Sequence, residues 1–169
     1  MKIHSLEDLC VEQLRDLYSA ENQIIKALPK MAKAATADEL RQAFEEHLEQ
    51  TRTQVERLEQ VFELFGAKAR GKKCEAIEGL IEEAKDLMQE NIDPLVLDAG
   101  LIAAAQKVEH YEIASYGCVR TWARRLGHTD AADLLQQTLD EEGETDHRLT
   151  ELAEHFVNVG AQEAPQRSR

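Results

Sequence analysis

Two closely spaced glutamates, Glu109 and Glu112, are the first indication of a functional site in this sequence. If segment 106–116 is helical, each residue advances about 100° around the axis, so Glu109 shares an apolar face with Ile113 and Tyr116, and Glu112 lies beside it. A carboxylate buried in such a face is costly unless it pairs with a cation, binds a metal ion or stays protonated. The function of the protein depends on which of these states the two glutamates adopt.

Three other segments each turn one ligand-type residue toward the interior on the same helical wheel: Glu21, His47 and Glu142. Together with the first pair, these glutamates would bring about four negative charges into one region, whereas the inward basic groups are His47 and Arg120. Arg120 lies about three turns, roughly 16 Å, beyond Glu109, which is too far to neutralise the cluster. Two divalent cations would balance the charges, and carboxylate and imidazole ligands suit iron or manganese. We therefore predict a dinuclear metal site.

A metal-free polar core is the alternative, in which the carboxylates share protons and bond to His47 and to other polar side chains. Residues that could serve as further ligands, or as hydrogen-bond partners of the ligands, are Thr51, Gln54, Tyr116 and Asp146. Four carboxylates on separate inward faces favour the metal site over this alternative. The literal Glu-x-x-His formed by Glu144 and His147 is rejected because both residues lie far from the inward line of their helix. The same wheel places Glu46 and Glu49 at the surface.

Four long amphipathic segments and one shorter segment must position these residues. The expected helices span residues 5–29, 36–65, 77–88, 95–126 and 131–156. Capping boxes at 5–8 (SLED) and 36–39 (TADE) begin the first two, and Pro29 should kink or end the first. A Gly- and Lys-containing loop at 66–73 leads to the short helix, and the inward line of the last helix reaches Phe156.

This order of elements is typical of a ferritin-like four-helix bundle with one long crossover connection, in which metal sites draw glutamates and Glu-x-x-His pairs from facing helices. We therefore expect an all-α domain over residues 1–160, with the short crossover helix against the outside of the bundle, and a polar tail over 161–169. Tyr111 and Trp122 lie on the opposite side of their helix from Glu109, so the crossover helix or a second subunit must cover them.

The formal charge of −13, from 33 acidic and 20 basic residues, argues against binding to nucleic acids or anionic membranes. No apolar run approaches the roughly 18 residues of a membrane span, and the N-terminus lacks the apolar region of a signal peptide. Cys10, Cys74 and Cys118 are widely spaced and odd in number, which is typical of reduced thiols in a cytoplasmic protein. We expect Cys10 to lie in the core and Cys74 to be more exposed.

Four segments of the chain resemble the YciE/YciF family of ferritin-like bacterial stress proteins, and the similarity covers nearly the whole chain. They are 17–21 (LYSAE), 43–49 (AFEEHLE), 74–84 (CEAIEGLIEEA) and 103–117 (AAAQKVEHYEIASYG). The resemblance implies a dimeric ferritin-like protein, similar to rubrerythrin around its metal site. The metal-site positions that it supports are Glu21, Glu109, Glu112 and Glu142. The sequence departs from the general ferritin-like pattern in its second helix, where Thr51 and Gln54 replace an inward Glu-x-x-His and His47 lies one turn earlier. The fourth helix also lacks an inward His, and these departures leave open a weakened or asymmetric site, or the loss of one metal, beside the predicted dinuclear site.

The residues predict a cytoplasmic protein with an iron or manganese site and no binding to nucleic acids or membranes, and the resemblance implies a homodimeric stress protein. Glu21 and Glu142 would be terminal ligands. Glu109 or Glu112 would bridge the metals, and His47 would supply a nitrogen ligand or support one. The expected class of activity is peroxide reduction or oxidation of ferrous iron. The alternative is a metal-free structural or interaction dimer with a relic polar core and a partner surface made of its outer aromatic residues.

Overall fold

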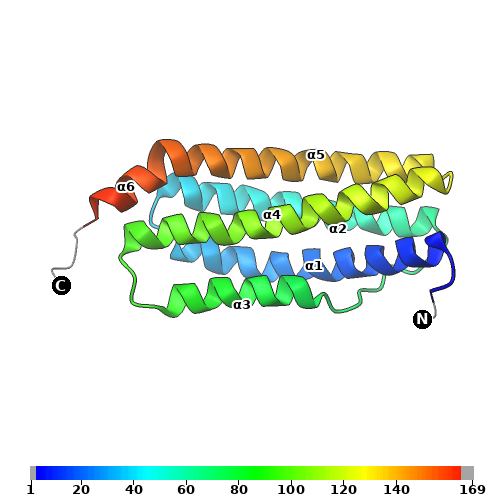
Figure 1. Cartoon of the computed structure of the whole chain (residues 1–169), viewed down its shortest axis with the longest axis horizontal. Helices are drawn as coiled ribbons and strands as arrows, with labels where there is room; N and C mark the ends of the chain where they lie inside the picture. The colour runs from blue at the N-terminus through cyan, green and yellow to red at the C-terminus, as the bar shows by residue number, and fades with distance from the viewer. Residues whose placement is uncertain (1–2, 165–169) are drawn as a thin grey trace.

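The computed structural model describes residues 3–164, and the chain forms a bundle of helices (Figure 1). The helices are α1 (Leu6–Ala34), α2 (Asp38–Leu64), α3 (Glu75–Gln89), α4 (Pro94–Arg125), α5 (Thr129–Leu152) and α6 (Asn158–Glu163), with a π-helical turn at Ala153–Val157 between the last two. This order confirms the predicted all-α bundle with a short crossover helix. Within the described range, none of these helices combines the length and apolar character that crossing a membrane requires.

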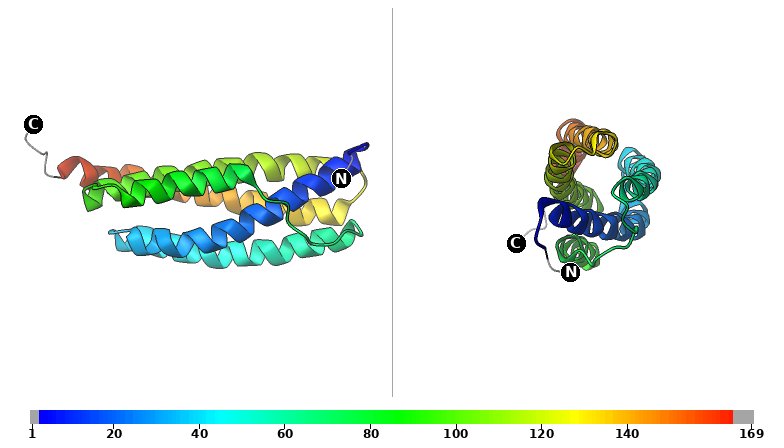
Figure 2. Two further views of the ribbon diagram at one scale, coloured as in Figure 1. Left: turned by 90° about the horizontal axis from the view of Figure 1, so that it is seen from below. Right: turned by 90° about the vertical axis from the view of Figure 1, so that its right-hand side faces the viewer.

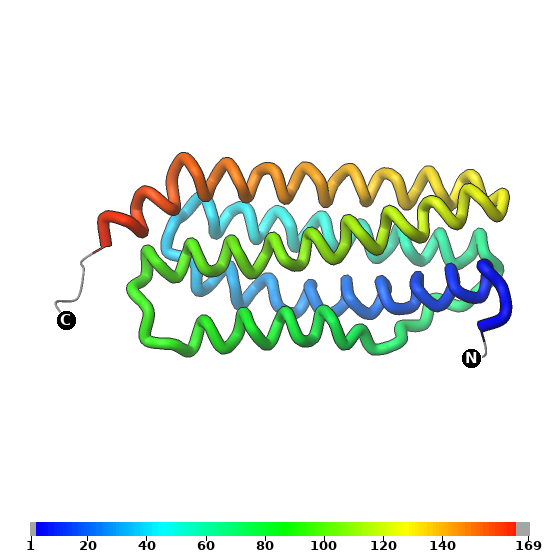
Figure 3. Tube along the Cα trace, in the orientation of Figure 1, coloured from blue at the N-terminus to red at the C-terminus, as the bar shows by residue number. Residues whose placement is uncertain are grey.

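The long helices α1, α2, α4 and α5 run along the molecule and form the bundle, as the ribbon and the tube both show (Figures 1 and 3). α1 packs on α2 and α4 on α5, and the bundle closes through contacts of α1 with α4 and of α2 with α5. α3 lies outside this arrangement, against α1 and α4, as the end-on view shows (Figure 2, right). Gly100 of α4 permits this approach, because a Cβ atom there would lie 2.6 Å from Cδ2 of Leu87 in α3.

The apolar core consists of two clusters, one toward each end of the bundle, with a layer of polar side chains between them. Along α1 this layer falls between Leu17 of one cluster and Ile24 of the other, and along α4 it falls between Tyr116 and Ala105. The buried residues of this polar layer are Glu21, His47, Thr51, Gln54, Glu109, Glu112, Thr138 and Glu142. Each long helix therefore interrupts its apolar stripe at the same level of the bundle.

The first predicted capping box is confirmed, and the second is wrong. At the start of α1 the Ser5 hydroxyl accepts the Asp8 amide, and the Asp8 carboxylate accepts the Ser5 amide. At the start of α2 no side chain of the segment caps the helix. Instead, the buried carboxylate of Asp98 in α4 accepts the amides of Thr36 at 2.8 Å and Ala37 at 2.7 Å. The cap comes from a different helix, which a pattern of four adjacent residues does not reveal.

Two further helix ends differ from the prediction. α1 continues through Pro29 to Ala34, so Pro29 does not end it. The π-helical turn at Ala153–Val157 changes the register of the chain, so Phe156 is exposed and not inward. α6 then continues to Glu163, and the part of the predicted polar tail from residue 165 onward lies outside the described residues.

The side chains on the outer face of α4 are covered partly by the chain itself. The Tyr111 hydroxyl donates to Asp16 of α1 and lies 3.1 Å from Sγ of Cys74, just before α3. Cys74 is buried, so the prediction that it is more exposed is wrong, whereas Cys10 is buried as predicted. Trp122 is half-buried. Cover for Tyr111 therefore needs no second subunit.

Candidate metal centre

The polar layer brings four potential ligands from three helices together. His47 of α2, Glu109 and Glu112 of α4, and Glu142 of α5 each offer a ligand atom, and these atoms lie within 4.8 Å of one another. All four side chains are buried. Their assembly follows from the helical pattern, because each residue occupies a position where its helix would otherwise place an apolar side chain.

The group contains more acceptors than the surrounding protein satisfies. Both carboxylate oxygens of Glu109, Glu112 and Glu142 have no hydrogen-bond partner among the described residues. Nε2 of His47 also lacks one within the same range. Buried polar atoms are nearly always paired in native proteins, so a cluster of unpaired ones indicates a missing ion, proton or water. Oxygen donors and one imidazole nitrogen fit iron or manganese.

Burial changes the protonation of these groups. It raises the pKa of Glu109 and Glu112 well above the usual range, and the negative charges of the other glutamates raise it further. The pKa of Glu142 is raised to about 7, also mainly by burial. Burial lowers the pKa of His47 to about 4. Near neutral pH the carboxyl groups therefore hold protons more readily than exposed ones, and the imidazole is neutral.

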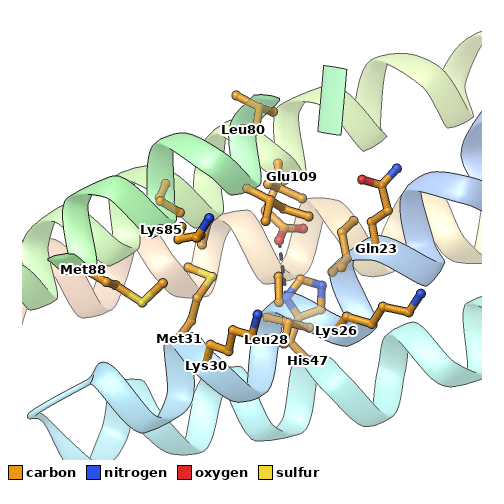
Figure 4. A pocket seen from close by; sticks show the side chains of 17 residues that line it. Gln23, Lys26, Leu28, Lys30, Met31, His47, Leu80, Lys85, Met88 and Glu109 are labelled. Atoms are coloured by element: carbon orange, nitrogen blue, oxygen red, sulfur yellow. Dashed lines mark ion pairs between the residues drawn. The ribbon is translucent and has the colours of Figure 1, made fainter. Parts of the chain in front are cut away.

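His47 lies between the two acidic helices of the site. Its Nδ1 is 3.4 Å from Oε1 of Glu109, the contact drawn as a dashed line in Figure 4, and its Nε2 is 3.9 Å from Oε2 of Glu142. Because burial keeps this imidazole neutral near pH 7, neither contact is a true ion pair there. A neutral imidazole is the form that binds metals.

Glu21 lies beside the group of four and is fixed by Tyr116. The Tyr116 hydroxyl donates to Oε1 of Glu21, while Oε2 has no partner among the described residues. Burial, followed by the negative charge of Glu142, raises the pKa of Glu21 well above its usual range. Tyr116, predicted as a supporting residue, thus orients one carboxylate of the polar layer.

The other predicted supporting residues have different surroundings. The Thr51 hydroxyl donates to the His47 carbonyl at 2.8 Å, within α2. The Gln54 amide donates to Glu141 at 3.1 Å, and its own oxygen has no partner in residues 3–164. Asp146 is half-buried and accepts the Gln106 amide at 3.2 Å, and the structure does not bring it into the group of four.

Arg57 and Glu141 are part of this region, and the sequence analysis missed both. Arg57 donates two hydrogen bonds of 2.8 Å to the two carboxylate oxygens of Glu141 and one of 2.7 Å to Thr138. Its side chain is 12% exposed. The prediction that His47 and Arg120 are the inward basic groups is therefore incomplete. The missed signal is the three-residue spacing of Arg57 from Gln54, which places them on neighbouring parts of one face.

The side chains that the helical wheel rejected are at the surface. Glu144 and His147 are exposed, and His147 lies 3.5 Å from the neighbouring Glu151. Glu46 and Glu49 are exposed as well and contact Arg148 and Arg52. Helical position therefore predicts burial here better than the literal Glu-x-x-His spacing does.

The chain is similar to proteins of known sequence and structure along most of its length. The family model described as "Domain of unknown function (DUF892)" matches residues 5–162. Protein YciF of Escherichia coli K12 is 50% identical over 163 residues, covering 96% of this chain and 98% of YciF. The crystal structure of that stress protein superimposes with a TM-score of 0.88 at 47% identity and covers 96% of this chain and 100% of its own.

Two other solved structures share the bundle. YcfI of Rhodopseudomonas palustris, whose description suggests a structural protein, has a TM-score of 0.86 at 49% identity and covers 88% of this chain and 95% of its own. A protein from Xanthomonas campestris pv. campestris has a TM-score of 0.74 at 23% identity, over 94% of this chain and 97% of its own, and shows the fold alone. These likenesses confirm the predicted relationship to YciF.

Proposed function

The chain belongs to the DUF892 family, and from this membership and its buried ligand group we propose that it is a cytoplasmic stress-response protein that holds iron or manganese in its bundle. The unpaired carboxylate oxygens of the polar layer are the observation that supports this proposal most strongly. Glu109, Glu112, Glu142 and His47 would hold the metal, and Glu21 would be a further ligand positioned by Tyr116. Dinuclear centres of ferritin-like bundles use four carboxylates and two histidines, and this chain would offer four glutamates and one histidine.

The proposed activity is peroxide reduction or oxidation of ferrous iron. A bound iron or manganese pair would supply the exchange of electrons with peroxide or oxygen. The protein's own residues would prepare the site. The two apolar clusters pack on both sides of the polar layer, and Tyr116 orients Glu21. The neutral His47 offers a nitrogen lone pair without competing protonation near pH 7.

Metal content per chain tests the proposal directly. Metal-free protein is loaded with ferrous or manganous ions without oxygen, desalted and analysed for its elements. We expect about one or two ions per wild-type chain, and at least a tenfold loss of affinity in Glu109→Gln and Glu142→Gln because each loses a charged ligand. Glu144→Gln is the matched control, since it removes an exposed glutamate from the same helix as Glu142. Folded wild type that takes up no metal would overturn the proposal.

The second candidate function is a metal-free structural or interaction dimer. The description of YcfI supports it, and so do the exposed apolar side chains of Phe156, Val159, Leu95 and Val96. These four side chains belong to the end of the molecule where α6 is beside the first turns of α4 (Figures 1 and 2). We propose a homodimer under either function. Wild type that stays folded, dimeric and metal-free after loading would favour this second candidate.

A further inference from the structure

An apolar pocket between α1, α3 and α4 extends from the surface to the polar layer (Figure 4). Its volume is about 210 Å³. Buried cavities of about 150 Å³ are large enough to bind benzene, so this pocket can hold a short hydrocarbon chain. Most of its lining is apolar, including Leu28 and Met31 of α1 and Leu80 and Met88 of α3.

The two ends of the pocket differ in exposure and chemistry. His47 and Glu109 also line it, and both are buried, so they mark its inner end. Lys26 and Lys30 of α1 line it as well and are exposed, so they mark its mouth. Apolar walls therefore lie between the lysines of the mouth and the ligand group of the polar layer.

The mouth is positively charged in a chain whose formal charge is −13. Lys26 and Lys30 make no ion pair within residues 3–164, whereas Lys85, the third lysine of the lining, pairs with Glu82 at 2.8 Å. Glu109, at the buried end, is the acidic residue among the lining side chains. Lys26 and Lys30 are four residues apart on one helix, so their side chains are neighbours and can approach one anionic group together.

We propose that this pocket binds a medium-chain carboxylic acid. The carboxylate lies at the mouth between Lys26 and Lys30, and the hydrocarbon chain extends along the apolar walls toward His47 and Glu109. Hydrogen peroxide alone would need neither the apolar walls nor the cationic mouth. The end of the hydrocarbon chain faces a metal centre only if the proposed function is correct. The binding of the carboxylic acid depends only on the pocket.

Binding of octanoate to the metal-free, full-length protein tests this inference separately from the metal site. Titration calorimetry should show saturable binding of octanoate and much weaker binding of acetate, which lacks the chain, and of octylamine, which has the opposite charge. Lys26→Gln/Lys30→Gln should weaken octanoate binding about three- to tenfold, the range expected for two exposed ion pairs. The effect should diminish at high salt. Lys33→Gln, which removes an exposed lysine of the same helix outside the pocket lining, should leave it unchanged.

NMR signals of the methionine methyl groups can show where the hydrocarbon chain of octanoate binds. The sequence has three methionines, and Met31 and Met88 line the pocket. In a spectrum of protein labelled with ¹³C at the methionine methyl groups, octanoate should shift both of these signals, which the Met31→Leu and Met88→Leu variants assign. Ala27→Leu, which adds bulk to the wall, should weaken binding while circular dichroism shows a folded protein.

Three results would overturn the inference: no saturable octanoate binding, equal binding of octylamine, or binding that leaves the Met31 and Met88 signals in place. A change in oligomeric state on Lys26→Gln/Lys30→Gln, without a change in octanoate affinity, would instead assign this face to a second copy of the chain. Because every measurement uses metal-free protein, a failure here leaves the metal-loading result intact. Metal-free wild type that binds octanoate as expected would support the pocket even if loading fails.

Discussion

Three glutamates with both carboxylate oxygens unpaired among the described residues, and Glu21 with one, impose a cost in the interior of the helical bundle that the rest of the molecule must offset. Glu109, Glu112 and Glu142 meet this cost in the metal-free protein by holding protons more tightly, since burial raises the pKa of each. A metal ion would replace those protons, because carboxylate ligands bind it in their deprotonated form. Proton and metal therefore compete for the same oxygens, and this competition is the chemical basis of the proposed site.

Arg57 supplies a compensating positive charge, and its removal is a direct test of that role. Arg57→Gln should lower the free energy of unfolding of metal-free protein by about 2–3 kcal/mol, because Glu141 loses a two-point partner in a partly buried position. Urea unfolding at pH 7 measures this loss. Arg52→Gln is the control on the same helix: its contact with Glu49 is exposed, so its removal should cost less than about 0.5 kcal/mol. Similar losses for both variants would show that the Arg57 pair is no stronger than a surface contact.

The helical wheel predicted the buried ligand-type residues because burial along a helix repeats with its geometry. Glu21, His47 and Glu142 each replace an apolar residue of a regular stripe, so the pattern alone places them inside. Arg57 and Glu141 lie at the edge of such a stripe. Their long side chains reach around the helix toward each other, and the direction of that reach depends on the neighbouring helix, which the sequence of one segment does not specify.

At the scale of the helices, one buried carboxylate joins the beginning of α2 to α4. Asp98 accepts the amides of Thr36 and Ala37, which are otherwise among the unpaired donors at a helix start. It also fixes the turn between α1 and α2 against α4. The hairpin of the first two helices is thereby oriented on the second pair, whose glutamates complete the polar layer.

Asp98→Asn should therefore destabilise the bundle by about 2 kcal/mol, since an amide offers one neutral acceptor where a charged carboxylate bonded two amides. Thermal or urea unfolding of metal-free protein measures the change. Asp93→Asn is the comparison variant: this residue caps α4 through one amide, that of Leu95, at 3.0 Å, and Asn is also a good cap, so the change should be below about 0.5 kcal/mol. Equal stability of the two variants would argue against the role of Asp98.

The helices themselves were predictable, whereas their junctions were less so. Amphipathic periodicity extends over many residues and survives a local exception, so all four long helices and the crossover helix follow from it. The cap of α2 comes from Asp98, 61 and 62 residues away from the amides it accepts. The π-helical turn at Ala153–Val157 likewise depends on how the last helix meets α4, and it reverses the expected position of Phe156.

For the whole molecule, two apolar clusters stabilise the bundle and the polar layer between them weakens it unless its charges are neutralised. A protein that only needed to be stable would fill this layer with apolar side chains, because replacing buried charges in this way is often neutral or stabilising. In this protein α1, α4 and α5 each place a glutamate in the polar layer, and α2 places His47 there. Stability and the proposed metal binding would therefore be linked through the same residues.

This linkage predicts that the stability of the metal-free protein depends on pH and that the stability of the metal-bound protein depends on it much less. The folded state raises the pKa of Glu142 from 4.5 to about 7 and raises those of Glu21, Glu109 and Glu112 as well, so the folded state binds more protons than the unfolded state above pH 4.5. The free energy of unfolding of the metal-free protein should then fall as pH rises, by up to about 1.4 kcal/mol per pH unit for each proton released. His47 contributes the opposite slope, because its folded pKa of about 4 lies below 6.5, but only between those values. The range from pH 6.5 to 8 therefore isolates the carboxyl groups.

Urea unfolding at several pH values in this range measures both slopes. The metal-free wild type should lose stability toward pH 8, and Glu142→Gln should lose less, because its amide does not titrate. With manganous ions in excess this slope should nearly vanish, because the metal-bound folded state and the unfolded state both hold these carboxylates deprotonated between pH 6.5 and 8. The ions should also stabilise the folded state, by about 2.7 kcal/mol at a hundredfold excess over the dissociation constant. Glu144→Gln should behave as wild type in both series, since its side chain is exposed. A metal-free protein with no slope between pH 6.5 and 8 would mean that water reaches the polar layer and screens its charges. A falling slope that manganous ions leave unchanged would show that the carboxyl groups of the layer bind protons and no metal.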